Sequence, residues 1–281
     1  MEIVRRVHAM REVSRQARAK GHKIGFVPTM GCLHDGHLSL VRRVKEVCDV
    51  VVVSVFVNPT QFGPRDDFER YPRDLTRDAD LCIAEGVDYV FAPEAEEIYP
   101  RGACTFVETE GLSTVLEGES RPGHFRGVAT VVLKLFSAVR PHVAAFGQKD
   151  AQQAVVIQRM TKDLMLDIEV LVLPTVRDED GVALSSRNAY LSDEQRIAAR
   201  AIPRAIQAAE KRVAEGEWDA EGLLAAAREI LEAEPLVLID YIALVDTTHL
   251  RPVDEVAGDA LLLLAARIGE TRLIDNTTLR R

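Results

Sequence analysis

The chain is predicted to fold as an α/β protein, with a doubly wound parallel sheet followed by a smaller C-terminal α+β domain. Strands and helices alternate at the spacing of βα units through residue 175, which is typical of a parallel sheet covered by helices. The run 50–57 (VVVVSVFV) is almost entirely apolar and rich in valine, as expected for a central strand buried on both faces. Beyond residue 181 the chain becomes rich in alanine, so we expect domains at 1–176 and 177–281.

The individual elements follow from apolar periodicity and from the turn residues between them. In the first domain the expected strands are 23–27, 50–57, 87–91, 143–146 and 168–173. The expected helices there are 4–20, 38–48, 75–85, 127–139 and 150–163. The second domain is expected to contain helices 193–216 and 219–233, then strands 238–245, 260–266 and 271–274. Ligands of such a parallel sheet bind at the carboxyl ends of the strands.

Composition excludes several classes of function. The net charge of −9 argues against a general nucleic-acid binder, which carries a basic excess. The four cysteines show no C-x-x-C pairing, which is typical of reduced thiols in a cytoplasmic protein. The first residues lack the apolar core of a signal peptide, and the longest apolar runs are too short to cross a bilayer. We therefore expect a cytoplasmic protein without a membrane or nucleic-acid partner.

Residues 25–38 are the most informative segment, because they combine a strand, a turn and a helix start with two histidines. A helix start exposes unpaired N–H groups and the positive end of the helix dipole, so it binds anions. His34 and His37 add donors there, and Gly31 and Gly36 allow close approach of the backbone to a ligand. The pattern predicts a phosphate site. The alternatives are a metal-binding pair or a structural cap, although no third metal ligand lies nearby in sequence.

Polar residues follow two other strands at the same edge of the sheet. Gln61, after the strand 50–57, can donate to a carboxylate and accept from a hydroxyl; the alternative is that 58–63 is only a capped turn. Lys149 and Asp150, after the strand 143–146, can reach phosphate and ribose, and Gln153 lies one turn further on. The alternative is a surface lysine beside an ordinary helix cap.

Two further loops carry candidate anion ligands. Arg126, in the segment 123–128, is either an anion ligand or a solvated arginine, and His124 beside it is either a site residue or part of a capping loop. The segment 184–188 between the domains offers two hydroxyls and a guanidinium, which suit the β- and γ-phosphates of a nucleotide, or form an ordinary polar linker. Four aspartates are candidate magnesium ligands: Asp66, Asp67, Asp74 and Asp78. We prefer Asp78 among them.

The motifs PTMG-x-LH-x-GH, VNP-x-QF, GHF-x-GV, FG-x-KD-x-QQ and SSRN occur here in one order and spacing. Together they resemble the pantoate–β-alanine ligase (pantothenate synthetase) family over nearly the whole chain. The H-x-G-H element alone indicates only a wider nucleotidyltransferase superfamily with a Rossmann-like domain. The resemblance implies formation of pantothenate through a pantoyl adenylate, with release of pyrophosphate and then AMP. It also implies that the enzyme uses Mg²⁺ and is a homodimer.

Residue roles carry over by matching motifs. The resemblance implies catalytic roles for His37, His34, Lys149 and Arg187, with His37 acting on the α-phosphate and the leaving group. It implies that Gln61 and Gln153 bind pantoate and that Gln61 also borders β-alanine. The implied ATP-binding residues are Met30, Gly31, Cys32, Leu33, His34, Asp35, Gly36, His37, Gly147, Gln148, Lys149, Asp150, Val176, Leu184, Ser185, Ser186 and Arg187. Within this set, Cys32, Asp35 and Leu184 depart from the residues more usual in the family.

Two other functions remain compatible with the residues. A different nucleotidyltransferase would keep the histidine pair but would not need Gln61 and Gln153. A nucleotide sensor would bind ATP in the same pocket without turnover. A tRNA synthetase is disfavoured by the small second domain and the acidic charge balance.

Overall fold

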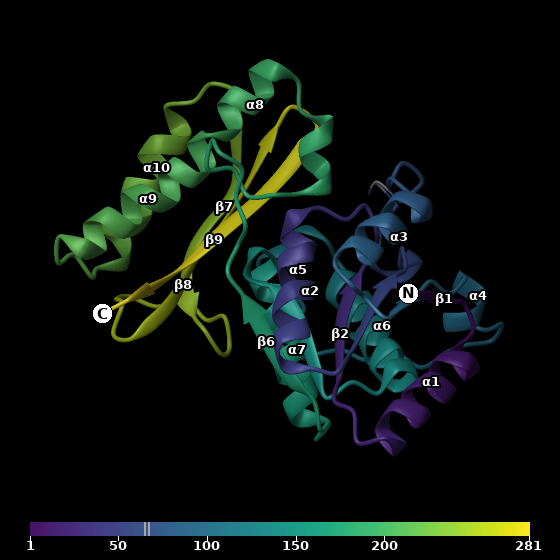
Figure 1. Ribbon diagram of the computed structural model, residues 1–281. Helices are drawn as coiled ribbons and strands as arrows, with labels where there is room; N and C mark the ends of the chain where they lie inside the picture. The colour runs from purple at the N-terminus through teal and green to yellow at the C-terminus, as the bar shows by residue number, and fades with distance from the viewer. Residues whose placement is uncertain (65, 67) are drawn as a thin grey trace. The chain divides into compact units, whose positions relative to one another are not determined.

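The computed structural model describes residues 1–64, 66 and 68–281, which form two compact units (Figure 1). The first unit comprises Met1–Gly147 and Val156–Leu173, and the second comprises Gln148–Val155 and Pro174–Arg281. Residues 148–155, which the sequence assigned to the first domain, therefore pack with the second unit. The division into functional domains at 176 stays a prediction. Among the described residues, no helix has the length and apolarity that a membrane span requires.

The first unit is built on a six-stranded sheet in which every pair is parallel, in the order β1-β4-β3-β2-β5-β6. The strands are β1 (Glu2–Val4), β2 (Ile24–Thr29), β3 (Val50–Val55), β4 (Tyr89–Phe91), β5 (Val143–Gly147) and β6 (Glu169–Leu173). The predicted doubly wound α/β fold is thus confirmed. The edge strand β1 was not predicted, because three residues are too few to show the period of a strand and the expected helix 4–20 overlapped it.

The helices of the first unit are α1 (Val7–Ala19), α2 (Asp35–Val47), α3 (Leu75–Ala84), α4 (Ala95–Ile98), α5 (Glu117–Ser120), α6 (His124–Val139) and α7 (Ala151–Asp163). The helix α7 begins in the second unit and ends in the first. Two short 3₁₀ turns, η1 (Pro59–Gln61) and η2 (Gln148–Asp150), follow β3 and β5. The sequence missed α4 and α5 and began α6 at residue 127, since short helices carry too few periodic positions.

The alternation of side chains along β2 separates the two faces of the sheet. Val27 is buried in one cluster with residues of α2 and with Cys82 of α3. Phe26 points to the opposite face, where its ring packs edge-on against Phe136 of α6 at 6.3 Å. Helices on both faces explain why the strands read as continuous apolar runs (Figure 1).

The order of strands fixes where a ligand can bind. The chain leaves β2 for β3 on one side, whereas β5 pairs with β2 on the other side. The strand order therefore reverses between β2, which ends at Thr29, and β5, which ends at Gly147. Open α/β sheets bind their ligands at the carboxyl ends of the strands at such a switch point.

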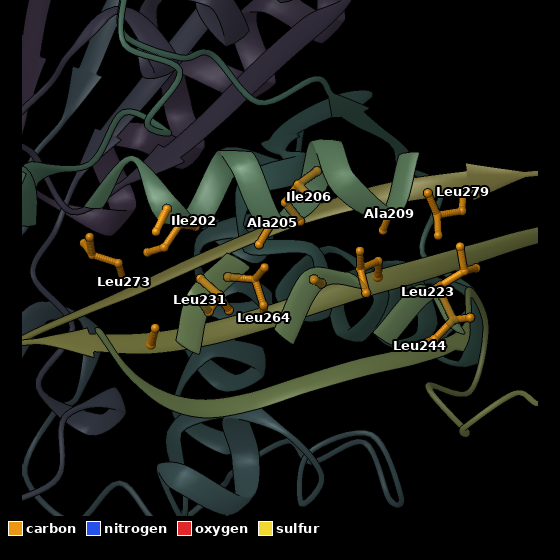
Figure 2. Packing of buried hydrophobic residues seen from close by; sticks show 14 of the residues in the cluster. Ile202, Ala205, Ile206, Ala209, Leu223, Leu231, Leu244, Leu264, Leu273 and Leu279 are labelled. Atoms are coloured by element: carbon orange, nitrogen blue, oxygen red, sulfur yellow. The ribbon is translucent and has the colours of Figure 1, made fainter. Parts of the chain in front are cut away.

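The second unit contains an antiparallel sheet of β7 (Val237–Asp246), β8 (Asp259–Ile268) and β9 (Thr271–Arg280). Its helices are α8 (Asp193–Ala199), α9 (Ala201–Ala214) and α10 (Ala220–Glu232), with the 3₁₀ turn η3 at Ser186–Tyr190. Figure 2 shows Ile202 and Ile206 of α9 in one apolar cluster with Leu264 of β8. This core confirms the predicted α+β unit.

A proline divides the helix that was predicted at 193–216. Pro203 has no N–H to donate to the carbonyl of Ala199, so the helical bond at that position is lost. Arg200 ends α8 and begins α9, and its own N–H bonds to Ile197 at 3.2 Å, as in a tighter turn. The alanine-rich pattern alone concealed this break.

His142 makes the stability of the first unit depend on pH. Its Nδ1 accepts a hydrogen bond from the N–H of Ile24 at 2.8 Å, at the start of β2, and only a neutral imidazole can do so. Burial, with the nearby positive charge of Arg18, lowers the pKa of His142 below 6.5. The unfolded chain therefore takes up a proton at a higher pH than the folded protein.

We expect the free energy of unfolding to fall as the pH drops below the unfolded pKa of about 6.5 and through the lower folded pKa. Urea unfolding at about pH 7.5 and about pH 5.5 measures this loss. His142→Asn keeps an acceptor for Ile24 but has no proton to gain, so it should lose less stability between the two pH values. Equal losses in the two proteins would remove His142 as a source of pH dependence.

Candidate functional site

The turn after β2 is shaped by a glycine and a threonine. Thr29 Oγ1 donates to the carbonyl of Ser54 on β3 at 2.6 Å and accepts from the N–H of Gly31 at 3.1 Å. Gly31 has φ +84°, and a Cβ there would lie 2.8 Å from Asp78 Oδ2. A side chain at this position is excluded both by backbone conformation and by space. The close approach predicted for Gly31 is thus one toward Asp78.

The carboxylate of Asp78 anchors this turn. Its two oxygens accept the N–H groups of Cys32 at 2.9 Å and Leu33 at 2.8 Å, and the residue is only 1% exposed. Burial raises the pKa of Asp78, and the two backbone hydrogen bonds oppose that rise. Asp78 therefore fixes the backbone that leads into α2, a role that the sequence did not indicate.

Three of the four aspartates considered for magnesium have partners within the protein. Both oxygens of Asp78 are bound to the turn, so this buried group does not fit the predicted role of a metal ligand. Asp74 caps α3 by accepting from the N–H of Arg77, and Asp66 accepts from Arg121 at 3.0 Å. Asp67 lies outside the described residues. Within the part of the chain that the structure describes, no three His, Cys, Asp or Glu side chains are grouped as metal ligands.

His34 and His37 lie together at the start of α2. His34 is the N-cap residue, and its carbonyl accepts from the N–H groups of His37 at 2.8 Å and Leu38 at 3.1 Å. The imidazole of His34 makes no capping bond, which argues against the structural-cap interpretation. The two rings are 4.1 Å apart between centroids. Two imidazoles and a helix N-terminus thus occupy one place, as the anion-site interpretation requires.

Gln61 is held in a defined orientation beside that turn. Asn58 Nδ2 donates to Gln61 Oε1 at 3.0 Å, and Gln61 Nε2 contacts Met30 Sδ at 3.2 Å. Gln61 is 8% exposed and Asn58 is 1% exposed. The structure therefore brings together Met30 and Gln61, which the sequence had placed after different strands.

Tyr99 is a residue of this network that sequence reasoning missed. Its hydroxyl donates to Asn58 Oδ1 at 2.8 Å and lies 3.0 Å from Thr60 Oγ1. Burial raises the pKa of Tyr99, so the phenol stays protonated as a donor at neutral pH. Tyr99 orients Asn58, and Asn58 in turn orients Gln61. No local motif surrounds Tyr99, so no signal in the sequence could have found it.

The segment 123–128 supports the backbone of Gln61. His124 Nδ1 donates to the carbonyl of Gln61 at 2.9 Å. Gly127 packs so closely that a Cβ there would lie 2.6 Å from the carbonyl carbon of Thr60 and 2.7 Å from Gln61 Cα. Arg126 instead places its guanidinium 4.0 Å from the centre of the Phe106 ring. This geometry favours a supporting role for the segment over anion binding by Arg126.

The loop after β5 holds the second group of predicted nucleotide ligands. Gln148, Lys149 and Asp150 form η2, and Lys149 Nζ lies 3.6 Å from Asp150 Oδ1. The carbonyls of Gln148 and Lys149 both accept from Asn276 on β9. Gln153 is half-buried on the first turns of α7. These residues all belong to the second unit.

Val176 and the segment 184–187 are joined by a backbone bond. The N–H of Leu184 donates to the carbonyl of Val176 at 3.0 Å, which closes a hairpin. Ser185 Oγ accepts from the N–H of Arg187 at 3.3 Å, so Ser185 caps η3. Ser186 and Arg187 lie in η3 and are half-buried. The structure thus joins four predicted ATP ligands to Val176 within the second unit.

The chain matches the family model described as pantoate-beta-alanine ligase over residues 2–278. The chain belongs to the pantoate–β-alanine ligase family. It is 55% identical over 279 residues to the pantothenate synthetase of Pelotomaculum thermopropionicum and 53% identical over 279 residues to that of Moorella thermoacetica, covering 99% of each chain. The activity that it shares with this family is the ligation of pantoate to β-alanine, so the protein is a ligase.

Solved structures agree with the family assignment. A pantothenate synthetase from Thermus thermophilus is 46% identical and has a TM-score of 0.95, and the match covers 100% of both chains. A pantoate-beta-alanine ligase from Francisella tularensis, described as complexed with beta-gamma ATP and beta-alanine, is 35% identical with a TM-score of 0.81. The match covers 99% of this chain and 97% of that one. The fold of this family is therefore the fold of this chain.

Gly127→Ala should destabilise the first unit. The added methyl group would meet the backbone of Thr60 and Gln61, which cannot move without disturbing η1, so we expect a loss of about 1–3 kcal/mol in the free energy of unfolding. Urea unfolding measures it. Ser137→Ala on the exposed side of the same helix is the matched control and should change stability by less than about 0.5 kcal/mol. If Gly127→Ala were as stable as the wild type, the close packing of α6 against the backbone of η1 would be contradicted.

Proposed function

We propose that this ligase works in two half-reactions through a pantoyl adenylate. In the first, a carboxylate oxygen of pantoate attacks the α-phosphorus of ATP, and the bond to the β-phosphate breaks to release pyrophosphate. In the second, the amine of β-alanine attacks the acyl carbon, AMP leaves with the electron pair of the C–O bond, and the amine loses a proton. The observation that carries this proposal is the pair of imidazoles at the start of α2.

The histidine pair suits the first half-reaction. Negative charge grows on the α-phosphate oxygens and on the departing pyrophosphate as the carboxylate attacks. Imidazole N–H groups and the N-terminus of α2 can donate to such charge, and both histidines lie half-buried at the start of this one helix. We assign His37 to the α-phosphate and the leaving group, and His34 to the adjacent phosphate oxygens.

Gln61 suits the pantoate carboxylate and hydroxyl. Because Asn58 donates to Gln61 Oε1, the amide cannot rotate freely, and Gln61 Nε2 is directed toward Met30 Sδ. A thioether is a weak acceptor, so a carboxylate or hydroxyl oxygen would be a better partner for this N–H. We assign pantoate to Gln61 and Gln153, and β-alanine to the neighbourhood of Gln61.

The residues of the second unit suit the nucleotide. Lys149 can neutralise phosphate oxygens, Asp150 can accept from a ribose hydroxyl, and Arg187 with Ser185 and Ser186 can bind the outer phosphates. We assign the adenine to the backbone at Val176. Gly147, which ends β5 in the first unit, is also assigned to ATP: a Cβ there would meet no described atom within 4 Å, so packing does not explain this glycine. The Francisella relative, described as complexed with beta-gamma ATP and beta-alanine, supports the same two ligands here.

Magnesium is proposed to be held by ATP rather than by Asp78. Mg²⁺ commonly binds substrate phosphates and water with only one or two protein carboxylates, and it supplies charge neutralisation when bound. Asp78 does not fit as such a carboxylate, because both of its oxygens already accept backbone N–H groups. We also propose a homodimer in the cytoplasm, which rests on the family resemblance and on the cysteine usage.

Product release separates this proposal from the alternatives. Purified protein with Mg²⁺ and ATP should release pyrophosphate only when pantoate is added, and AMP only when β-alanine follows. A sensor would bind ATP and release neither. A different nucleotidyltransferase would release pyrophosphate without dependence on pantoate, and either outcome would overturn the adenylate proposal.

His37→Ala should lower kcat by about 10²- to 10³-fold, comparable to the loss of one charge-stabilising donor. His8→Ala, an exposed histidine on α1, is the control and should leave kcat unchanged. The measurement is steady-state pyrophosphate release at saturating ATP, pantoate and β-alanine. A kcat equal to that of the wild type would exclude His37 from the first half-reaction.

Gln61→Ala should raise the apparent KM for pantoate more than the apparent KM for ATP, since the lost amide faces the hydroxy acid in our assignment. Gln16→Ala, at an exposed position of α1, is the matched control. Initial rates with each substrate varied in turn give both constants. A larger rise in the KM for ATP would mean that Gln61 is wrongly assigned to pantoate.

A further inference from the structure

Two buried polar residues lie in the middle of β9. Asp275 is 2% exposed and Asn276 is 3% exposed, and they stand opposite Leu264 and Leu263 of β8 in the ladder. Burying a carboxylate and an amide is costly unless each is fully hydrogen-bonded. No motif of the sequence includes this pair, and the family resemblance assigned it no role.

Asn276 uses its side chain to hold the loop after β5. Its Nδ2 donates to the carbonyls of Gln148 and Lys149, each at 2.9 Å, and its Oδ1 accepts from Gln148 Nε2 at 3.0 Å. One amide thus makes three hydrogen bonds to two successive residues. The position of the backbone at Lys149 is therefore fixed by a side chain of β9.

Asp275 uses its side chain to hold the hairpin that carries the other ATP segment. It forms a two-bond ion pair with Arg177, at 2.6 and 3.0 Å, and the side chain of Asp275 is only 1% exposed. Arg177 also donates to the carbonyl of Gly181 at 3.1 Å. The guanidinium therefore ties β9 to the hairpin that runs from Val176 to Leu184.

The pleat of β9 directs the side chains of Asp275 and Asn276 to opposite faces of the sheet. Successive side chains of a strand point to opposite faces, so adjacent residues can hold segments on both sides of a sheet. Leu273 and Leu279, in step with Asp275, belong to the core beneath α9, and Thr277 Oγ1 donates to Glu210 of that helix. Asn276 faces the other way, toward η2.

We propose that Asp275 and Asn276 are positioning residues for ATP, which set the Lys149 loop and the Val176–Leu184 hairpin from one strand. Neither residue needs to touch ATP. Asn276 acts through Lys149, and Asp275 acts through Arg177. This inference rests on the proposed function, because it takes Lys149 and the segment 184–187 as ATP ligands.

A double-mutant cycle tests the coupling between Asn276 and Lys149. Asn276→Ala is measured in the wild-type protein and in Lys149→Ala, with kcat/KM for ATP and the apparent KM for β-alanine determined in each. Thr277→Val is the control, since it removes a side-chain bond of the next residue on β9 that leads to α9 instead of the loop. Asn276→Leu keeps the volume without the donors, and thermal unfolding by circular dichroism shows whether each variant is folded.

We expect Asn276→Ala to lower kcat/KM for ATP by about 10- to 100-fold, as small displacements of a binding group do. In Lys149→Ala the same change should cost less than about threefold, because residues that act through one another are not additive. Thr277→Val and the KM for β-alanine should stay within about twofold of wild type.

Equal losses in both backgrounds, or wild-type kinetics of both Asn276 variants, would overturn the positioning role while leaving the proposed function intact. Failure of the proposed function looks different. In that case the wild-type protein would release no pantoate-dependent pyrophosphate, or Lys149→Ala would keep the wild-type kcat/KM for ATP.

Discussion

The buried carboxylate of Asp78 is the constraint on which the first half of the site depends. It holds the N–H groups of Cys32 and Leu33, and this fixes the path from β2 into α2. The positive φ of Gly31 and the absence of its side chain make room for that carboxylate. His34 and His37 come directly after this turn, so their position follows from a contact that no ligand makes.

The same principle operates around Gln61 and Lys149. Polar side chains to which no substrate role is assigned fix the few groups assigned to the chemistry: Tyr99 and Asn58 fix Gln61, and Asn276 fixes the backbone of Lys149. Buried hydrogen bonds of this kind cost desolvation but confer a single geometry, which catalysis by charge stabilisation requires. Several of the supporting residues come from α3, the end of α4 and β9, far from the motifs in sequence.

The sequence predicted the architecture well where the signals were periodic and long. The valine-rich run of β3 and the βα spacing indicated a parallel sheet, and the motif order indicated the family. Short or mixed signals were missed: β1 has three residues, Pro203 interrupts an alanine-rich helix, and the expected strand 271–274 stopped before Asp275 and Asn276 although β9 continues to Arg280. Aspartate and asparagine are poor strand formers, so strand propensity predicted an end before Asp275 and Asn276. These are the two residues that hold the Lys149 loop and the Val176–Leu184 hairpin.

The candidate site was predictable as a set of loops but not as a geometry. The strand ends predict that His34, Gln61 and Lys149 lie at one ligand-binding edge of the sheet, because parallel strands share that edge, and for Lys149 this stays a prediction. The partners that orient them depend on tertiary contacts, such as Tyr99 with Asn58, which local spacing does not encode. Asp78 illustrates the limit most clearly: its charge suggested a metal, whereas its burial beneath Cys32 and Leu33 shows an anchor.

The adenylate intermediate is the central claim, and oxygen transfer tests it most directly. Pantoate labelled with ¹⁸O in its carboxyl group would be incubated with ATP, Mg²⁺ and β-alanine, and the products analysed by mass spectrometry. Attack of the carboxylate on the α-phosphorus predicts one ¹⁸O in each AMP and none in pyrophosphate. Unlabelled AMP, or label in another phosphate product, would contradict the account.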